Sequence, residues 1–301
     1  MLGGVELGGT KVVCVAGTGP DDVHAEVEIP TRDPHATLAE VVSFFARHPV
    51  EALGIASFGP VELRPVNPRW GAITRTPKPG WSGADVAGPL GRALTVPVAF
   101  DTDVNGAALG EGRWGAARGL TSFVYVTVGT GIGGGAVVGG RLVHGLVHPE
   151  LGHVPVPRQP GDDFESACPF HRDCWEGMTS GPALAARFGV RLEEADDETR
   201  GEAAALASAY LASGLRALVY ALAPERIVLG GGVASLPGLH DLIRAALRDE
   251  LGGYPGLPEH DDECFVVAPE LGARAGSLGA LVLAESALAA GPEAAGSGPP
   301  P

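Results

Sequence analysis

Positive charge is scarce in this sequence. Its 301 residues include 21 Lys and Arg against 36 Asp and Glu, which gives a formal net charge of -15. A surface of this sign repels nucleic-acid phosphates and anionic lipid, so we expect neither nucleic acid nor membrane as a partner. A phosphorylated ligand would need local hydrogen-bond donors or a metal ion.

Long apolar runs and targeting signals are also lacking. No apolar run approaches the roughly 20 residues that a membrane-spanning helix needs. The opening MLGGV has no basic region followed by a long apolar core, as a signal peptide would. The hydrophobic fraction of 45% is that of an ordinary globular protein. We expect a cytoplasmic protein with one large domain or two lobes, each able to bury its own core.

Only four cysteines are present, and two of them lie close together beside histidines in a C-x2-H-x2-C pattern. A further histidine stands fifteen residues before the first cysteine of that pattern. Two thiolates and two imidazoles complete a tetrahedral Zn²⁺ site with no open position, which indicates a structural metal. A disulfide or an incidental cluster is the alternative, although a reducing cytosol favours the metal. The predicted ligands are His153, Cys168, His171 and Cys174.

Other histidines carry no metal spacing. His24, His144 and His148 have no partner at a ligand-like distance in the sequence. We interpret them as surface or hydrogen-bonded histidines.

Glycine, in contrast, is abundant, with 46 residues. Many glycines follow runs of β-branched residues, which indicates functional turns rather than low complexity. A strand, a glycine turn and a second strand open the chain, and the same order recurs near its middle, which suggests an internal duplication. The turns are residues 8–10, between strands at 4–7 and 11–16, and residues 129–135, between strands at 122–128 and 136–138.

The second turn matches the letters of the dinucleotide-binding motif G-x-G-x-x-G at residues 129–134. That motif needs a helix directly after the turn, whereas residues 136–143 are predicted to form a hairpin. A Rossmann site is therefore excluded, and no P-loop motif occurs. A glycine turn can still direct several backbone N–H groups at a phosphate. A third glycine cluster, residues 230–232, follows a predicted strand at 226–229. For each turn taken alone, the alternative is that its glycines only form a tight turn and bind no ligand.

Two carboxylates, Asp101 and Asp103, stand between a predicted strand at residues 96–100 and a predicted helix at 104–112. Phosphoryl transfer to a sugar hydroxyl needs a base for the proton and a metal ion for the phosphates. A carboxylate at the end of a strand suits that base, and helix capping explains the same position equally well. The Pro- and Gly-rich residues 59–79 are too many for a simple connection and form a candidate binding loop.

These motifs together resemble the ROK (repressor, ORF, kinase) family within the actin-like and hexokinase-like ATPases. The resemblance implies an α/β fold of the two-lobed actin-like ATPase (ribonuclease H-like) type, with duplicated sheet-and-helix lobes and a cleft between them. The lobes would be residues 1–115 and 116–290, with a zinc-binding insertion at about 149–177 and a disordered tail at 291–301. The matching motifs are Glu6-Leu7-Gly8-Gly9-Thr10-Lys11, Asp103-Val104-Asn105, Gly129-Thr130-Gly131-Ile132-Gly133, His148-Pro149-Glu150-Leu151-Gly152-His153, and Glu176-Gly177 through Ser180-Gly181.

The resemblance implies an ATP-dependent kinase for a free sugar. Asp103 would be the base that deprotonates the sugar hydroxyl, which favours catalysis over capping. Mg²⁺ would lie between the turns that hold the ATP phosphates, and Zn²⁺ would be structural. The implied sugar-binding residues are Gly59, Asn105, Glu150, His153 (also a zinc ligand) and Glu176. The implied nucleotide-binding residues are Gly8, Gly9, Thr10, Lys11, Gly129, Thr130, Gly131, Gly133, Gly230, Gly231 and Gly232.

Three segments resemble the bacterial fructokinase branch: residues 168–174, Asn67-Pro68 and residues 76–81. That branch implies phosphorylation of fructose to fructose 6-phosphate. Thr102 stands where many ROK kinases have asparagine, which leaves one usual sugar contact unaccounted for. His171 replaces the third cysteine of the usual zinc motif.

Three other functions compete with a fructokinase. The sugar could be glucose, mannose or an N-acetylhexosamine. A sugar-responsive repressor would carry an N-terminal helix-turn-helix domain, whereas the first predicted strand begins within five residues of Met1 and the acidic charge opposes DNA. A sugar sensor without catalysis would not need Asp103 and both phosphate turns. Family members are often dimers, so we expect a homodimer that binds sugar and ATP.

Overall fold

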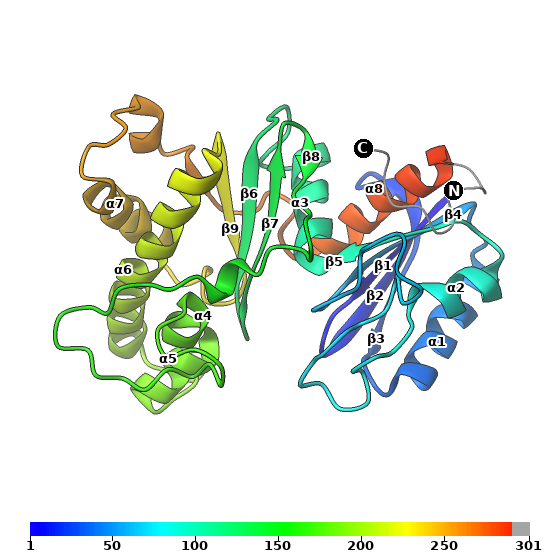
Figure 1. Ribbon diagram of the computed structural model, residues 1–301, viewed down its shortest axis with the longest axis horizontal. Helices are drawn as coiled ribbons and strands as arrows, with labels where there is room; N and C mark the ends of the chain where they lie inside the picture. Colours follow the sequence, from blue (N-terminus) through cyan, green and yellow to red (C-terminus); the bar gives the residue numbers. More distant parts are fainter. Residues whose placement is uncertain (291–301) are drawn as a thin grey trace. The chain divides into compact units, whose positions relative to one another are not determined.

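The structure, a computed structural model, describes residues 1–290 (Figure 1). The chain divides into two compact units, each with one β-sheet and its own helices. Unit 1 contains Met1–Gly119, Leu142–Pro149 and residues 271–290, and unit 2 contains Leu120–Arg141 and Glu150–Glu270. The predicted α/β fold with two lobes is confirmed. The predicted disordered tail, residues 291–301, lies outside the described residues.

The sheet of unit 1 has the strand order β3-β2-β1-β4-β5. Its first three strands form an antiparallel meander, and β4 and β5 continue it in parallel with β1. The strands are β1 (Leu2–Leu7), β2 (Lys11–Gly19), β3 (Asp22–Pro30), β4 (Ala52–Ser57) and β5 (Val98–Thr102). The helices are α1 (Pro34–Arg47), α2 (Ala87–Leu94), α3 (Asp103–Trp114) and α8 (Ala275–Ala290), with a 3₁₀ turn at Gly272–Arg274.

Both faces of this sheet are covered by helices. A Cβ added at Gly3 would lie 2.8 Å from the ring of Phe45 in α1, and one added at Gly4 would lie 2.8 Å from the carbonyl oxygen of Ser277 in α8. Since neighbouring residues of a strand point to opposite faces, α1 and α8 pack on opposite sides. Burial on both faces also explains why β4, ALGIAS, reads as one continuous small and apolar run.

Helices α3 and α8 pack with their backbones in contact. A Cβ on Gly279 of α8 would overlap the carbonyl oxygen of Gly106 in α3. One turn further along α3, a Cβ on Gly110 would lie 2.5 Å from the carbonyl oxygen of Ala275. This close approach fixes α3, whose first residue is Asp103, against the helix that covers β1 and β4.

Gly279→Ala is therefore expected to destabilise the protein by about 3 kcal/mol, because the added methyl group forces two packed helices apart. The matched control is Gly201→Ala in α6, where an added Cβ meets no atom within 4 Å. There the better helix propensity of alanine should stabilise by about 0.5–1 kcal/mol. Urea denaturation of both variants measures the two effects, and equal shifts of the midpoint would contradict this packing.

The sheet of unit 2 repeats the first one. Its strand order is β10-β9-β6-β7-β8. The first two strands along the chain, β6 and β7, form an antiparallel hairpin, and β9 pairs in parallel with β6 on its other side. The predicted duplication of strand, glycine turn and strand is thus seen in both units. The strands are β6 (Phe123–Val128), β7 (Ile132–Val138), β8 (Arg141–Leu142), β9 (Arg226–Gly230) and β10 (Val266–Val267).

The helices of unit 2 are α4 (Trp175–Thr179), α5 (Gly181–Phe188), α6 (Asp197–Leu222) and α7 (Leu239–Leu251), with 3₁₀ turns η1 (Leu151–His153) and η2 (Pro258–Asp261). Trp175 of α4 and Tyr210 of α6 are fully buried and belong to the core of this unit. A Cβ on Gly214 of α6 would overlap the indole of Trp175, so a glycine allows α4 to sit on α6.

The units differ from the predicted division at residues 115 and 116. The chain first passes from unit 1 to unit 2 after Gly119, close to the predicted boundary, but the C-terminal helix and Leu142–Pro149 also belong to unit 1. The physical reason is that α8 is apolar around most of its circumference and packs on β1, β2, β4 and α3. Because a helix buried on all sides has no polar stripe, its sequence does not indicate which sheet it covers.

Two helices are long and apolar enough, by length and composition alone, to cross a membrane: α6 and Gly272–Ala290. Charged residues interrupt the apolar sequence of both helices, Arg216 in α6 and Glu285 in α8. In each of the two, 56% of the most apolar window is buried inside the structure. Core helices of globular proteins pass the same test.

Candidate functional site

Asp103 is the first residue of α3, directly after β5. The helix is capped by Thr102, whose Oγ1 accepts a hydrogen bond from the Asn105 backbone N–H at 3.1 Å. The Asp103 carboxylate accepts instead from the N–H of Val104, at 2.9 Å. Capping therefore does not require Asp103. Removal from water raises the pKa of Asp103 from 3.8 to about 6, and the Val104 N–H partly opposes this shift. Such a carboxyl is ionised at neutral pH and basic enough to accept a proton.

Glu6, near the end of β1, is a second carboxylate in this part of unit 1. Burial and, to a smaller extent, the negative charge of Asp103 raise the pKa of Glu6 to about 7. Its side chain packs on Gly276, where an added Cβ would lie 2.5 Å from Cδ. Among the described residues, its buried Oε2 has no hydrogen-bond partner. No role was predicted for Glu6 from the sequence, although an acidic residue inside an apolar strand and just before a glycine turn was a usable signal.

The turn between β1 and β2 is closed by a hydrogen bond from the Gly8 N–H to the carbonyl oxygen of Lys11, 3.0 Å long. Gly9 at its tip has open space around it, since an added Cβ would meet no atom within 4 Å. Thr10 is exposed, and the Lys11 ammonium lies 2.6 Å from Glu28. The hydrogen bond that Lys11 donates to Glu28 raises the pKa of Lys11. A phosphate contact by Lys11 would require this exposed ion pair to open.

The candidate binding loop at residues 59–79 is held by a small polar network. Glu62 accepts hydrogen bonds from the Arg64 side chain and, at 2.7 Å, from the Asn67 amide. The hydrogen bond from Arg64 lowers the pKa of Glu62 to about 2. Asn67 thus has a structural partner in the loop. Gly59 is the first residue of the loop, and an added Cβ there would lie 3.5 Å from the His148 ring.

Asn105 is almost fully buried, with 1% of its surface exposed. Its amide nitrogen donates to Asp101 Oδ1 at 2.6 Å. The amide nitrogen is therefore bound to a neighbouring carboxylate inside unit 1, whereas the buried Oδ1 has no hydrogen-bond partner among the described residues. Its predicted contact with sugar stays a prediction, and the geometry favours a supporting role.

In unit 2 two predicted nucleotide turns meet at one edge of the sheet. β6 and β9 are parallel neighbours, so their carboxyl ends lie side by side. The N–H of Val233, just after the third glycine cluster, donates to the carbonyl oxygen of Val128 at 2.9 Å. Gly231 has a φ of 95°, and an added Cβ would overlap Val128, so the close approach requires glycine.

The turn at Gly129–Gly131 also contacts Glu176. The Ile132 N–H donates to Glu176 Oε2 at 2.9 Å, and a Cβ on Gly131 would lie 2.5 Å from the same oxygen. Thr130 is exposed at the turn. Gly133, predicted as a turn residue, instead pairs with Thr127 within the β6–β7 ladder. The predicted strand, glycine turn and strand are thus present as β6 and β7, and a predicted sugar contact, Glu176, lies beside the predicted phosphate turn.

Glu150 and His153 border the 3₁₀ turn η1. A Cβ on Gly152 would overlap the carbonyl oxygen of Ile132, so η1 sits directly on the start of β7. Glu150 is exposed, and its carbonyl oxygen accepts a hydrogen bond from the His153 N–H at 3.0 Å. Glu150, His153 and Glu176 are therefore all close to Ile132 or its neighbours in unit 2, while Gly59, Asp103 and Asn105 belong to unit 1.

The four predicted metal ligands come together in unit 2. The ligand atoms of His153, Cys168, His171 and Cys174 all lie within 4.8 Å of one another. Cys168 Sγ is 3.6 Å from His171 Nδ1 and 4.0 Å from His153 Nδ1. A tetrahedral zinc with bonds of about 2.3 Å to sulfur and 2.0 Å to nitrogen needs separations of about this size. All four cysteines of the chain are free thiols. The donor set and its geometry fit a structural zinc.

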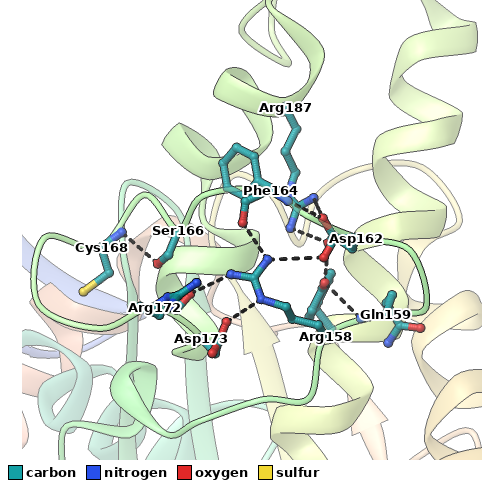
Figure 2. A network of polar contacts seen from close by, with 10 residues as sticks. Arg158, Gln159, Asp162, Phe164, Ser166, Cys168, Arg172, Asp173 and Arg187 are labelled. Carbon is teal, nitrogen blue, oxygen red and sulfur yellow. Dashed lines mark hydrogen bonds and ion pairs between the residues drawn. The ribbon is translucent and has the colours of Figure 1, made fainter.

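A polar network holds the rest of this segment in place (Figure 2). Arg158 donates to Asp173 Oδ1 at 2.6 Å and to the carbonyl oxygen of Phe164 at 2.7 Å. The Arg187 guanidinium pairs with Asp162 at 2.8 Å and lies 4.0 Å above the Phe164 ring. Despite its burial, Asp162 has its pKa held below the usual range by hydrogen bonds from Arg187 and Tyr210. The segment is thus fastened at its metal-ligating residues and again at α5 and α6.

The ROK family is the class of protein that this fold and these residues define. The family model matches residues 2–287, so the chain belongs to the ROK family. The chain is similar to the fructokinase of Zymomonas mobilis subsp. mobilis, with 42% identity over 95% of this chain and 97% of the relative. It is 40% identical to the fructokinase of Pediococcus pentosaceus, over 96% of this chain and 99% of that one. The crystal structure of a ROK family glucokinase from Streptomyces griseus, in complex with glucose and AMPPNP, matches with a TM-score of 0.75 and 26% identity, over 94% and 99% of the two chains.

Proposed function

We propose that this chain is an ATP-dependent kinase that phosphorylates fructose to fructose 6-phosphate. The observation that carries the chemistry is Asp103, a carboxylate at the start of α3 that is not needed for capping and whose pKa is raised to about 6. The choice of fructose rests on the two relatives named fructokinase, at 42% and 40% identity.

In the reaction, the Asp103 carboxylate accepts the proton of the sugar hydroxyl. The hydroxyl oxygen forms a bond to the γ-phosphorus of ATP as the bond from that phosphorus to the bridging oxygen breaks, and ADP leaves with the electron pair. Little covalent chemistry falls to the protein in such transfers, so positioning and charge stabilisation account for most of the rate. The N–H groups of Gly8 and Gly129 close their own turns by donating to the carbonyl oxygens of Lys11 and Gly131, so the other backbone N–H groups of these two turns would bind the phosphate oxygens.

Two metal ions belong to this proposal. Mg²⁺ neutralises phosphate charge when it is bound, and it prefers oxygen ligands. The Glu6 Oε2, which has no hydrogen-bond partner among residues 1–290, fits that requirement and would hold the ion. Zn²⁺ would be held by His153, Cys168, His171 and Cys174 and would have a structural role.

A second candidate substrate is glucose, because the Streptomyces griseus relative binds glucose in its crystal structure. Mannose and N-acetylhexosamines belong to the same test. The proposal includes a cytoplasmic location, consistent with four free thiols, and a homodimer. It includes no nucleic-acid partner, since the net charge of -15 opposes one.

The test is ADP release with Mg-ATP and a panel of fructose, glucose, mannose and N-acetylhexosamines. We expect kcat/KM for fructose to exceed that for every other sugar by about 10² or more, as a site built to pair sugar hydroxyls can achieve. Preference for another hexose would keep the kinase and correct the substrate. Absence of turnover with every sugar, in folded protein with its metal bound, would overturn the proposed function.

A further inference from the structure

Residues Leu142–Pro149 leave unit 2 after β8 and return to it at Glu150, but they themselves pack on unit 1. Two histidines hold them there. His148 Nε2 accepts a hydrogen bond from the Val61 N–H at 3.1 Å, at the start of the candidate binding loop. His144 Nε2 lies 2.9 Å from Asp101 Oδ2, at the end of β5. The segment therefore contacts both the loop and the turn that carries Asp103.

Asp101 is the centre of that turn. Its Oδ1 accepts hydrogen bonds from the Thr102 N–H at 2.8 Å and from the Asn105 amide at 2.6 Å. Its Oδ2 is left for His144. Asp101 is only 5% exposed, so its carboxylate depends on these three protein donors rather than on bulk water.

The protonation of the two histidines agrees with these contacts. The hydrogen bond to Asp101 raises the pKa of His144, which favours an imidazole whose Nε2 carries a proton and donates it to Oδ2. Burial lowers the pKa of His148, whose Nε2 accepts from Val61. The charged or titratable groups near His144 are thus Asp101, from the other side of the contact, and His148, on its own segment.

We propose that His144 is a positioning residue for the base Asp103: it holds Asp101, and through Asp101 the turn from Thr102 to Asn105 that places Asp103. This inference rests on the proposed function. Without His144 the buried Oδ2 loses its donor, which costs more than the hydrogen bond itself contributed. The carboxylate then has to turn towards water, away from the Thr102 N–H and the Asn105 amide on either side of Asp103.

The rate should be sensitive to this movement, because a misplacement of about 1 Å at a reacting group costs on the order of 10²-fold. His144→Leu is therefore expected to lower kcat about 10- to 100-fold while KM for fructose changes less than about threefold. His144→Gln, whose amide can still donate to Asp101, should recover most of that loss. The control is His24→Leu, since His24 pairs with Asp22 at 3.1 Å but both side chains are more than half exposed.

The pH profile separates positioning from an electrostatic role. The activity should fall at low pH as Asp103 becomes protonated. His144 is not among the causes of the raised Asp103 pKa, so the pH at which activity is half-lost should be the same in His144→Leu as in wild type, while kcat falls at every pH. A moved midpoint would overturn positioning in favour of a charge effect. A raised KM with unchanged kcat would overturn it in favour of direct sugar contact, and an unchanged kcat would overturn it outright.

Hydrogen exchange tests the same link without any turnover. In His144→Leu the backbone N–H groups of Thr102 and Asn105 should exchange faster. Their acceptors are Asp101 Oδ1 and Thr102 Oγ1, respectively, and both acceptors would no longer be held in a fixed position. Unchanged exchange at both amides would overturn the proposal whatever the activity. If the wild-type protein phosphorylates no sugar, the proposed function fails instead, and exchange alone then decides whether His144 holds the turn.

Discussion

Asp103→Asn is expected to lower kcat for sugar phosphorylation by about 10³-fold while the protein stays folded, because an amide cannot accept the hydroxyl proton as a base does. The fold should persist because α3 is capped by Thr102 and not by Asp103. The measurement is ADP release at saturating Mg-ATP and sugar, with circular dichroism on the same samples. Residual activity within tenfold of the wild type would remove Asp103 from the base role.

The wild-type pH profile and the stability of this variant follow from the same pKa. Asp103 must be ionised to act, so kcat/KM should fall as the pH drops below about 6. An acid whose folded-state pKa is raised from 3.8 to about 6 costs the folded state stability when ionised, fully so above pH 6 and not at all below its unfolded value. Asp103→Asn should therefore melt at a higher temperature than wild type at pH 7.5, and this difference should vanish towards pH 4.

A matched control separates this effect from the general loss of an aspartate near a helix start. Asp33 is the N-cap of α1, and its carboxylate accepts from the Ala36 N–H at 3.0 Å. Asp33→Asn keeps a capping side chain, so it should change the stability by a few tenths of a kcal/mol and leave kcat unchanged. A large loss of activity in Asp33→Asn would show that the assay responds to helix ends and not to a base.

The parts of the fold that were predictable from sequence are those with local patterns. A strand at residues 122–128, a glycine turn and a second strand were predicted from apolar residues on both sides of the glycines, and β6 and β7 have that arrangement. Three of the four metal ligands fall within seven residues, so their spacing alone predicted the cluster. Short helices such as α4 were missed, because Trp175 begins a single turn whose main signal is tertiary packing on α6.

The missed parts depend on contacts between distant residues. His144 and Asp101 are 43 residues apart, and His148 and Val61 are 87 apart, so no spacing in the sequence links either pair. Both histidines are hydrogen-bonded, one of the two interpretations that the sequence left open. The predicted sugar contact of Asn105 stays a prediction: its amide nitrogen is bound to Asp101, and its buried Oδ1 has no hydrogen-bond partner among the described residues. The motif thus identified Asp103 and Asn105 at the start of α3, and packing added Asp101 and His144 as partners that no local pattern links to them.

Removal of zinc is expected to have the second large effect, on stability. Residues 154–174 contain no helix or strand, so bonds to a metal would take the place of the hydrogen-bond ladders that order other segments. We expect one zinc per chain by metal analysis, and a fall of the melting temperature on the order of 10 °C after chelation, since loss of about 3 kcal/mol has roughly this effect in a protein of this size. Protein purified without chelators that contains no metal, or that melts unchanged after chelation, would contradict this prediction.

The same treatment should also impair catalysis, because the ligands are built into the elements that carry the proposed sugar residues. Cys174 is the N-cap of α4, its Sγ accepting from the Gly177 N–H at 3.3 Å, and Glu176 is the second residue of that helix. His153 ends η1. Cys174→Ser should therefore raise KM for fructose as well as lower the melting temperature, whereas Cys264→Ser, at an exposed thiol outside the cluster, should change neither.

Hydrogen exchange after chelation shows how far the effect of the metal extends. Because the Arg158 and Arg187 contacts do not depend on metal, faster exchange should be concentrated at residues 166–177 and should not extend to α6. Faster exchange spread evenly through unit 2 would show that zinc supports the whole unit and not this segment alone.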